Sequence, residues 1–431
     1  MEFYSTNQVS PVVSLQEALY KGLPDDNGLY MPSVIPQLSH DFIAGCHELS
    51  FTDIAFEVSR ALIGDEIPTD VLRSLIDDAF NFEVPLVQLD SNVHVLELFH
   101  GPTFAFKDFG ARFMARLFGY FLEQSDNEIN ILVATSGDTG SAVAQGFLGV
   151  PGVSVTLLYP SGKVSDLQEK QLTTNGHNIT ALEVTGTFDD CQKMVKEAFL
   201  DTNLNQKLNL TSANSINVAR LIPQSFYYMY AWSRLKEVSE EIAFCVPSGN
   251  FGNLSGGLLA RKMGMPVDHF VAATNVNDIV PHYLQTGNFE PKPSIQTLSN
   301  AMDVGNPSNF PRMQTLLGND FKEIAGHIEG FAYDDEATLE TISEVYDKFD
   351  YFLCPHSAIG YLGIKAFLDS HANFTGICLA TAHPAKFMET VDRATGSDVD
   401  VPLALEEVMG KAKDSVVIGN QYEDLKSYLM K

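Results

Sequence analysis

Lys107 is the residue whose type and setting point most directly to chemistry. It lies in HGPTFAFKDFGARFMARLFGYF (100–121), where apolar residues at helical spacing predict a helix that begins near the lysine. The positive end of a helix dipole and the flanking Phe106 and Phe109 both disfavour a charged ammonium there. The setting therefore favours a neutral amine, which can form a Schiff base with a carbonyl compound. A surface lysine packed against a phenylalanine-rich patch would show the same residues.

Two glycine-rich turns that follow predicted strands could bind anions. One is ATSGDTGSAV (134–143), which crowds a strand-to-helix turn with hydroxyl groups. The other is PSGNFGNLSGG (247–257), where Gly249 and Gly252 let the backbone approach a ligand closely. Backbone N–H groups at the start of a helix form an anion site, although an ordinary capped helix has the same composition. The chain contains no G-x-x-x-x-G-K-[ST] motif, so a Walker-type nucleotide loop is excluded.

Two further polar segments could also contact anions. TSANSINVAR (211–220) combines amide, hydroxyl and guanidinium groups, and Arg220 could clamp a phosphate through two hydrogen bonds. TAHPAKF (381–387) follows the last predicted strand, with Thr381 at the strand end and Lys386 at the start of the next helix. Helix caps, an exposed arginine and a core threonine are alternative interpretations of these residues. The nucleophile elbow G-x-S-x-G is absent, so the sequence does not support a hydrolase triad.

Strands alternate with helices along most of the chain, and these elements must position the polar segments. Short apolar runs predict buried strands at 127–137, 153–160, 178–186, 242–250, 269–275 and 375–384. Helical patterns occur at 139–149, 165–176 and 188–200, and an apolar-periodic stretch covers 216–235. This alternation predicts an α/β fold with mostly parallel sheets. Ligands bind at the carboxyl ends of the strands in such sheets, where the polar segments are expected to lie.

The length of 431 residues predicts two or three domains. We expect an N-terminal domain over 1–95, a small α/β domain over 96–240 that carries Lys107, and a large α/β domain over 241–431. The formal net charge of −28 disfavours binding to nucleic acid or to anionic membranes. A phosphate site in so acidic a chain must be built locally, from backbone N–H groups and selected lysine, arginine and asparagine side chains.

The five cysteines are scattered and form no C-x-x-C pair, which predicts neither a disulfide framework nor a zinc site. Cys354 and His356 are close in sequence, but two candidate ligands do not make a metal site. The first ten residues lack a basic region followed by an apolar run, and no apolar stretch reaches the length of a membrane span. We therefore expect a cytoplasmic protein without a bound metal.

Five segments together resemble the signature segments of bacterial and fungal threonine synthases, in the same order. They are HGPTFAFKDFG, TSGDTG, SANSIN, SGNFG and TAHPAKF. The resemblance covers nearly the whole chain, except for a tail after about residue 395 that shows nothing diagnostic. It implies the tryptophan-synthase-like fold of pyridoxal phosphate (PLP) enzymes, called fold type II. That fold would comprise two α/β domains with mostly parallel sheets, in addition to an N-terminal segment or domain.

The resemblance also assigns cofactor-binding residues. Lys107 matches the lysine that holds PLP covalently, and the loop Gly249-Asn250-Phe251-Gly252-Asn253 matches the loop that binds the PLP phosphate. Thr381 matches the hydroxyl residue that meets the pyridine nitrogen. Asp138 occupies the place near the phenolic oxygen of the ring where related enzymes often carry asparagine. A carboxylate beside a phenolate would be repelled, so the protonation state and partner of Asp138 stay open.

A second set of residues is implied for the substrate phosphate. Asn214, with its neighbour Ser215, and Arg220 match residues that bind this phosphate in relatives. Further anion contacts are expected, with less support, from Thr135, Ser136 and Lys386.

The implied function is the conversion of O-phospho-L-homoserine and water to L-threonine and phosphate, the last step of threonine biosynthesis. Lys107 would remove the α-proton, phosphate would leave the γ-carbon and water would add at the β-carbon. The alternative is another fold type II PLP lyase, either a dehydratase, which needs no second phosphate site, or a phospho-lyase that stops at 2-oxobutanoate. The sequence leaves the choice between a monomer and a homodimer open.

Overall fold

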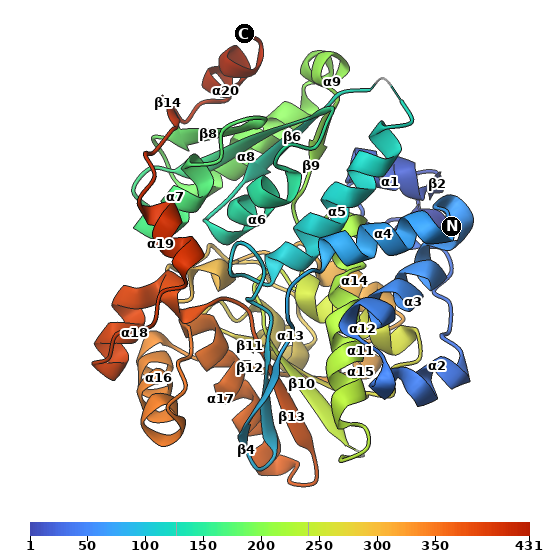
Figure 1. Cartoon of the computed structure of the whole chain (residues 1–431), viewed down its shortest axis with the longest axis vertical. Helices are drawn as coiled ribbons and strands as arrows, with labels where there is room; N and C mark the ends of the chain where they lie inside the picture. Colours follow the sequence, from blue (N-terminus) through green and yellow to red (C-terminus); the bar gives the residue numbers. More distant parts are fainter. Residues whose placement is uncertain (126, 240) are drawn as a thin grey trace.

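The computed structural model describes residues 1–125, 127–239 and 241–431, which form three β-sheets surrounded by helices (Figure 1). The first sheet is small, antiparallel and N-terminal, with the strand order β2-β1-β3. Its strands are β1 (Glu2–Ser5), β2 (Val13–Ser14) and β3 (Tyr30–Pro32). The accompanying helices are α1 (Leu15–Lys21), α2 (His40–Gly45), α3 (Phe51–Ile63) and α4 (Thr69–Ala79). Helix α3 starts at a capping box between Ser50 and Asp53, and it packs against α4 and α11 (Gln224–Leu235).

The second sheet has six strands in the order β12-β11-β10-β13-β5-β4, and only its edge strand β4 runs antiparallel. The strands are β4 (Leu86–Asp90), β5 (Val93–Glu97), β10 (Ile242–Pro247), β11 (His269–Thr274), β12 (Ile328–Ala332) and β13 (Thr375–Ala380). Helices α16 (Asp335–Phe349) and α17 (Pro355–Ser370) follow β12 along the chain, while α11 (Gln224–Leu235) and α12 (Gly252–Lys262) pack against each other. Because helices cover the sheet, β10 is buried along its whole length and its sequence is apolar throughout.

The third sheet has five parallel strands in the order β14-β8-β7-β6-β9. The strands are β6 (Ile129–Ala134), β7 (Val153–Pro160), β8 (Ile179–Val184), β9 (Leu210–Ser212) and β14 (Val416–Ile418). Its neighbouring helices are α5 (Lys107–Leu122), α6 (Asp138–Phe147), α7 (Asp166–Thr173), α8 (Phe188–Leu200) and α9 (Thr202–Leu208). The remaining helices are α10 (Val218–Leu221), α13 (Ile279–Thr286), α14 (Phe310–Leu316), α15 (Phe321–His327), α18 (Met388–Thr395), α19 (Leu403–Met409) and α20 (Tyr422–Leu429).

The six predicted strands and the α/β class with mostly parallel sheets are confirmed. The apolar-periodic stretch 216–235 is divided between α10 and α11, because Pro223 has no backbone N–H to continue a helix. The sheets do not follow the order of the chain. β4 and β5 join the six-stranded sheet, and the tail strand β14, red in Figure 1, joins the five-stranded sheet. The expected ranges 1–95 and 241–431 each contribute strands to two sheets.

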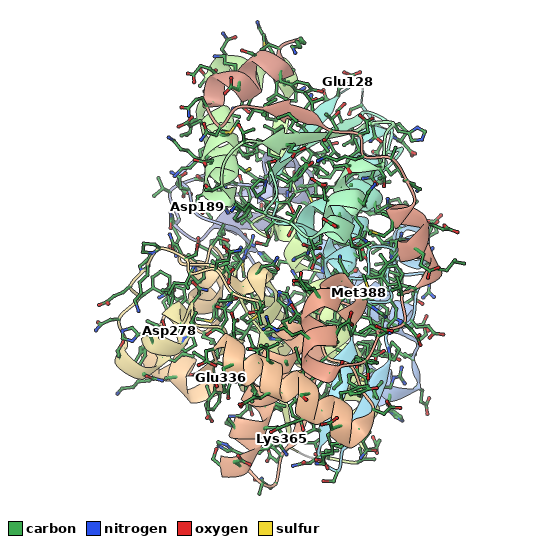
Figure 2. All side chains as sticks on the ribbon, turned by 90° about the vertical axis from the view of Figure 1, so that its left-hand side faces the viewer. Glu128, Asp189, Asp278, Glu336, Lys365 and Met388 are labelled. Carbon is green, nitrogen blue, oxygen red and sulfur yellow. The ribbon has the colours of Figure 1, made fainter. Side chains whose placement is uncertain are left out.

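The excess acidic charge is spread over the surface of the molecule. Figure 2 shows Glu128 just before β6, Asp189 on α8 and Glu336 on α16, and all three are exposed. All five cysteines are free and buried. Within the described ranges, no helix is both long and apolar enough to cross a membrane, and no cluster of three His, Cys, Asp or Glu could hold a metal ion.

Candidate active site

Lys107 is the first residue of α5, at the point where that helix meets the end of β13. The backbone N–H of Phe106 donates to the carbonyl of Thr381 at 2.8 Å, and Ala105 forms a bridge with Ala382. These bonds bring two segments that are far apart in sequence to one point, so Lys107 and Thr381 share the carboxyl edge of the six-stranded sheet. The side chain of Lys107 is only 16% exposed. Burial lowers its pKa, against the opposing effect of Asp138, and favours the neutral amine that the sequence predicted.

The turn before α5 is held by a second buried carboxyl group. Asp108 accepts hydrogen bonds from the backbone N–H of Thr103 at 2.9 Å and from its hydroxyl at 2.7 Å. Gly101 lies against this carboxyl, and a Cβ there would be 2.5 Å from Asp108 Oδ2. Burial raises the pKa of Asp108 to about 6. The glycine and aspartate of HGPTFAFKD therefore fix the start of the lysine helix.

Asp138 lies between two lysines. Its Oδ1 atom is 2.7 Å from Lys386 Nζ and its Oδ2 atom is 3.9 Å from Lys107 Nζ. Lys386 is fully buried, and its ammonium also donates to the carbonyl of Thr103 at 2.9 Å. Gln168 completes the surroundings of Asp138 by donating to Oδ1 at 3.1 Å. The charge partner of Asp138 that the sequence left open is therefore Lys386.

The two ammonium groups decide the charge of Asp138. Burial alone would raise its pKa, but Lys386 and then Lys107 outweigh this effect and hold the pKa well below its usual range. The site therefore contains an ionised carboxylate that is committed mainly to Lys386, which leaves Lys107 less strongly paired. Lys386 and Arg220 also act to lower the pKa of Lys107.

Thr135 and Ser136, in the first glycine-rich turn between β6 and α6, have different surroundings. Thr135 Oγ1 accepts from the backbone N–H of Gly137 at 3.0 Å and from that of Gly140 at 2.8 Å. Gly137 has φ +133°, and a Cβ there would lie 2.5 Å from Gln168, so the position requires glycine. Thr135 thus holds the turn that presents Asp138. Ser136 lies half-buried in the same turn.

The second glycine-rich turn connects β10 to α12. A Cβ on Gly249 would lie 2.8 Å from the carbonyl oxygen of Ala301, and Phe251 adopts a left-handed conformation with φ +60°. Asn253 accepts from the hydroxyls of Tyr227 at 2.7 Å and Tyr228 at 2.8 Å through its Oδ1. Its Nδ2 is buried and has no partner within the described ranges. A buried donor left unpaired at a helix N-terminus suits an anion, which fits a phosphate-bearing cofactor.

The segment around Arg220 carries two more unpaired atoms. Arg220 Nη1 donates to the carbonyl of Ala213 at 2.6 Å, whereas its Nε and Asn214 Oδ1 are buried without a partner in the described structure. Burial lowers the pKa of Arg220 to about 10, so the group stays a cation. A Cβ on Gly110, one turn after Lys107 in α5, would lie 2.5 Å from Arg220 Nε. A charged donor is therefore held close to Lys107.

Two residues of the site were not predicted as parts of it. His356, at the start of α17, accepts from the backbone N–H of Ala301 at 3.2 Å, and burial, with help from Lys107 and Lys386, lowers its pKa to about 4. In the sequence, His356 is notable only as a candidate metal ligand close to Cys354. Arg312 donates a hydrogen bond to the backbone carbonyl of Ser215, in the segment that carries Asn214. The turn-rich run GNPSNFPR (305–312) that carries Arg312 follows no predicted strand, so no signal in the sequence pointed to this residue.

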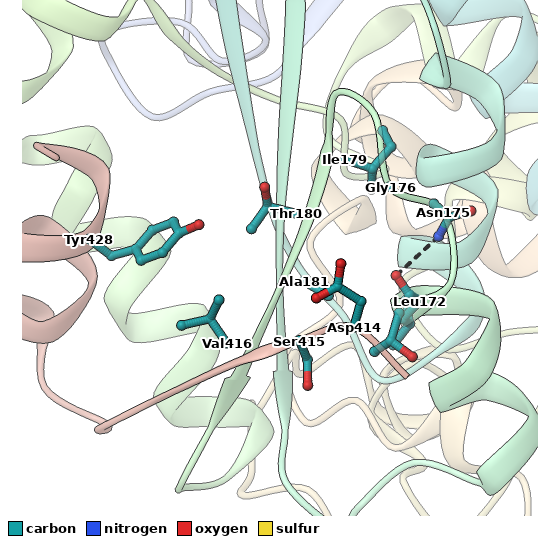
Figure 3. A pocket seen from close by; sticks show the side chains of 11 residues that line it. Leu172, Asn175, Gly176, Ile179, Thr180, Ala181, Asp414, Ser415, Val416 and Tyr428 are labelled. Carbon is teal, nitrogen blue, oxygen red and sulfur yellow. Dashed lines mark hydrogen bonds between the residues drawn. The ribbon is translucent and has the colours of Figure 1, made fainter. Parts of the chain in front are cut away.

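A separate hollow lies between β8, β14 and the end of α7, and none of the site residues described above is among those that line it (Figure 3). Its polar lining includes Asn175, Thr180, Asp414 and Ser415. The amide of Asn175 is already bonded to the carbonyls of Gln171 and Leu172. The residues that line this hollow include no lysine, arginine or histidine, so it offers no cationic side chain to a phosphate.

Three family models match the chain. They describe a pyridoxal-phosphate dependent enzyme over residues 82–374, the threonine synthase N terminus over 2–80 and the threonine synthase C-terminal region over 357–429. The chain is 43% identical over 433 residues to the threonine synthase of Haemophilus influenzae, with 100% of both chains covered. It is also 43% identical over 408 residues to that of Escherichia coli, with 94% of each covered.

Solved structures agree with these matches. The crystal structure of threonine synthase from Escherichia coli superposes with a TM-score of 0.93 at 41% identity, covering 100% of this chain and 99% of that chain. The PLP-bound threonine synthase from Brucella melitensis gives a TM-score of 0.93 at 35% identity, covering 100% and 98%. Threonine deaminase isoform 2 from Solanum lycopersicum has a TM-score of 0.56 at 13% identity over 85% of this chain and 97% of that chain, a likeness of fold alone.

Proposed function

Because this chain belongs to the threonine synthase family of pyridoxal-phosphate-dependent enzymes, we propose that the site around Lys107 converts O-phospho-L-homoserine and water to L-threonine and phosphate. One observation carries the proposal. Two sets of buried donors without a partner in the described structure, Asn253 Nδ2 on one segment and Arg220 Nε on another, accompany the amine of Lys107. A cofactor and a substrate that each bear a phosphate would need two such sets.

We assign the first set to the cofactor. The loop Gly249–Asn253 would hold the PLP phosphate, Lys107 would hold its aldehyde carbon, and Asp138 and Thr381 would face the ring. When bound there, PLP supplies an electron sink that makes hydrogens on the α- and β-carbons of an amino acid acidic. The unpaired donor of Asn253 and the lack of space for any side chain at Gly249 support this placement.

Lys107 is the proposed base. Its lowered pKa increases the fraction of neutral amine near neutral pH, and a neutral amine can accept the α-proton of the substrate and return a proton later. Lys386 supports this role by holding the Asp138 carboxylate at 2.7 Å, since an unshared Asp138 would favour protonated Lys107. Thr381 offers a neutral hydroxyl rather than a charge at its side of the site.

The second set would hold the substrate phosphate. Arg220 supplies a cation, while Asn214 and Ser215 supply polar groups on the preceding segment. Of the three additional anion contacts expected from the sequence, Thr135 and Lys386 have their polar atoms bonded within the protein, so Ser136 is the one we retain. Phosphate would leave the γ-carbon from this place, and water would add at the β-carbon. Binding energy from the phosphate group can thereby orient the reacting carbons next to Lys107.

The substitution Asn253→Asp tests the cofactor-phosphate loop. It keeps an oxygen for the hydroxyls of Tyr227 and Tyr228 but replaces the unpaired donor with an acceptor of negative charge. Losing a hydrogen bond to a charged group predicts that the PLP affinity falls by about 10- to 100-fold. A titration of the visible absorbance band with PLP measures the affinity. Asn209→Asp, the same change at an exposed position, is the matched control, and an unchanged affinity of the Asn253 variant would remove the loop from the phosphate site.

The free, buried cysteines support a cytoplasmic location, where thiols stay reduced.

Product analysis tests the proposed reaction. The full-length protein loaded with PLP is expected to release threonine and phosphate from O-phosphohomoserine in equal amounts. Release of 2-oxobutanoate in place of threonine would favour a phospho-lyase, and turnover of threonine or serine without phosphate release would favour a dehydratase.

A further inference from the structure

Arg312, in α14, is a buried arginine without a carboxylate partner in the described structure. It is 0% exposed, and burial lowers the pKa of its guanidinium to about 9. Nη1 donates to the carbonyl of Ser215 at 3.0 Å and to Asn309 Oδ1 at 2.8 Å. Nη2 donates to the carbonyls of Ile216 at 2.6 Å and Tyr30 at 3.1 Å. Burying a cation without a counter-charge costs free energy, so stability alone does not account for this residue.

The segment that carries Arg312 also contacts the glycine loop. The backbone N–H of Asn309 donates to the carbonyl of Asn250 at 3.2 Å, and the hydroxyl of Ser308 donates to Asn250 Oδ1 at 2.9 Å. Asn309 Nδ2 donates to Ser215 Oγ at 3.1 Å. The segment 308–312 therefore contacts both the glycine loop Gly249–Asn253 and the loop Ser212–Asn217, and it connects the two proposed phosphate sites.

The N-terminal part of the chain, through α1, also contacts the loop Ser212–Asn217, which carries the proposed substrate-binding residues Asn214 and Ser215. Besides the Tyr30 carbonyl on β3, Leu19 in α1 accepts a hydrogen bond from Asn217 Nδ2 at 2.9 Å. A Cβ on Gly22, just after α1, would lie 3.4 Å from the carbonyl oxygen of Ser212. Asn217 in turn caps α10 by accepting from the backbone N–H of Ala219 at 3.0 Å. The position of this loop therefore determines where α10 presents Arg220.

We infer that Arg312 is a positioning residue for the substrate phosphate. It clamps the loop Ser212–Asn217 between the glycine loop and the N-terminal sheet, so that Asn214 and Arg220 face a phosphate at a fixed distance from Lys107. The inference rests on the proposed function and gives the N-terminal part a role in substrate recognition. A guanidinium suits the task because its rigid fork reaches four acceptors, which an ammonium on a flexible chain does not.

The test uses the full-length protein loaded with PLP and compares wild type with Arg312→Lys, which keeps the charge and loses the fork. We expect the KM for O-phosphohomoserine and the Kd for inorganic phosphate, measured by calorimetry, to rise by about 10- to 100-fold, because small displacements of positioning groups have effects of this size. The visible band of the bound cofactor is expected to stay. Asn217→Ser, which keeps a cap and loses the tie to Leu19, should raise both constants in the same direction.

Arg112→Lys is the matched control. Arg112 is also buried and donates to backbone carbonyls, those of Ala79 and Asp78, yet it makes no hydrogen bond to either loop. The Arg112→Lys substitution is expected to lower the melting temperature without changing the KM for O-phosphohomoserine or the affinity for inorganic phosphate. The inference is overturned if Arg312→Lys behaves as this control does, or if both constants stay within twofold of wild type. Absence of turnover by the wild type would instead contradict the proposed function.

Discussion

Replacement of Lys107 by alanine is expected to abolish the visible absorbance band of the bound cofactor and to reduce threonine formation by at least about 10³-fold, because anchor and base are lost together. Lys107 lies at the start of α5, beside the end of β13, with its side chain 16% exposed. PLP added to the variant should still bind weakly through the glycine loop, since Asn253 and the backbone N–H groups remain.

The measurement is an absorbance spectrum with added PLP, together with phosphate release from O-phosphohomoserine. Lys348→Ala serves as the control, because Lys348 is 62% exposed on α16, and it should keep both signals. A visible band that persists in the Lys107 variant would contradict the assignment. It would move the covalent anchor to the second lysine of the site, the fully buried Lys386.

Replacement of Lys386 by methionine is expected to have the second largest effect, through Asp138. The change leaves the buried carboxylate with Lys107 as its nearest cation, 3.9 Å away. Removing one partner of a buried ion pair costs about 3–5 kcal/mol of folding free energy. The double variant with Asp138→Asn should recover much of this loss, since no unpaired charge then remains. Urea unfolding of the two variants and the wild type measures both effects.

Replacement of Lys386 by methionine should also shift the pH dependence of threonine formation in a defined direction. Asp138, Lys386, Arg220 and His356 are the charged or titratable groups that act around Lys107. Loss of the Lys386 cation raises the pKa of Lys107, so the rising limb of threonine formation should move to higher pH.

The pKa of Asp138, which is lowered in the wild type, should rise in the Lys386 variant. A carboxyl group whose pKa is lower in the folded than in the unfolded protein stabilises the fold at pH values above its unfolded-state pKa. This stability is lost as the pH falls through the folded-state pKa. The variant should therefore begin to lose stability at a higher pH on acidification. An unchanged rising limb and an unchanged acid unfolding midpoint would show that Lys386 does not control the charge of this site.

The sequence predicted those features of the fold and the site that depend on local patterns. The run IAFCV and the glycines after it correctly indicated a buried strand followed by a tight turn, and the phenylalanine spacing correctly placed Lys107 at a helix start. The resemblance to threonine synthases, based on five short segments, is confirmed by full-length relatives and by the family models. The roles assigned to individual site residues stay predictions.

Features that depend on distant pairing could not be predicted. Asp138 and Lys386 lie on separate glycine-rich and proline-containing turns, and nothing in either segment indicates that their charges meet. Arg312 could not be predicted because three of its four hydrogen bonds go to backbone carbonyls, which leave no pattern in side-chain types. The tail after residue 395 showed no motif, yet its strand β14 extends the five-stranded sheet, since edge pairing depends on backbone groups that any sequence provides.

The most direct test of the proposed reaction follows the oxygen of water. Reaction of the PLP-loaded protein with O-phosphohomoserine in H₂¹⁸O, followed by mass spectrometry of both products, shows which bond is broken. If phosphate leaves the γ-carbon and water adds at the β-carbon, threonine carries the heavy oxygen in its hydroxyl group and the phosphate stays unlabelled. Labelled phosphate together with unlabelled homoserine would mean that water attacks phosphorus, and it would contradict the assignment of this site to threonine synthesis.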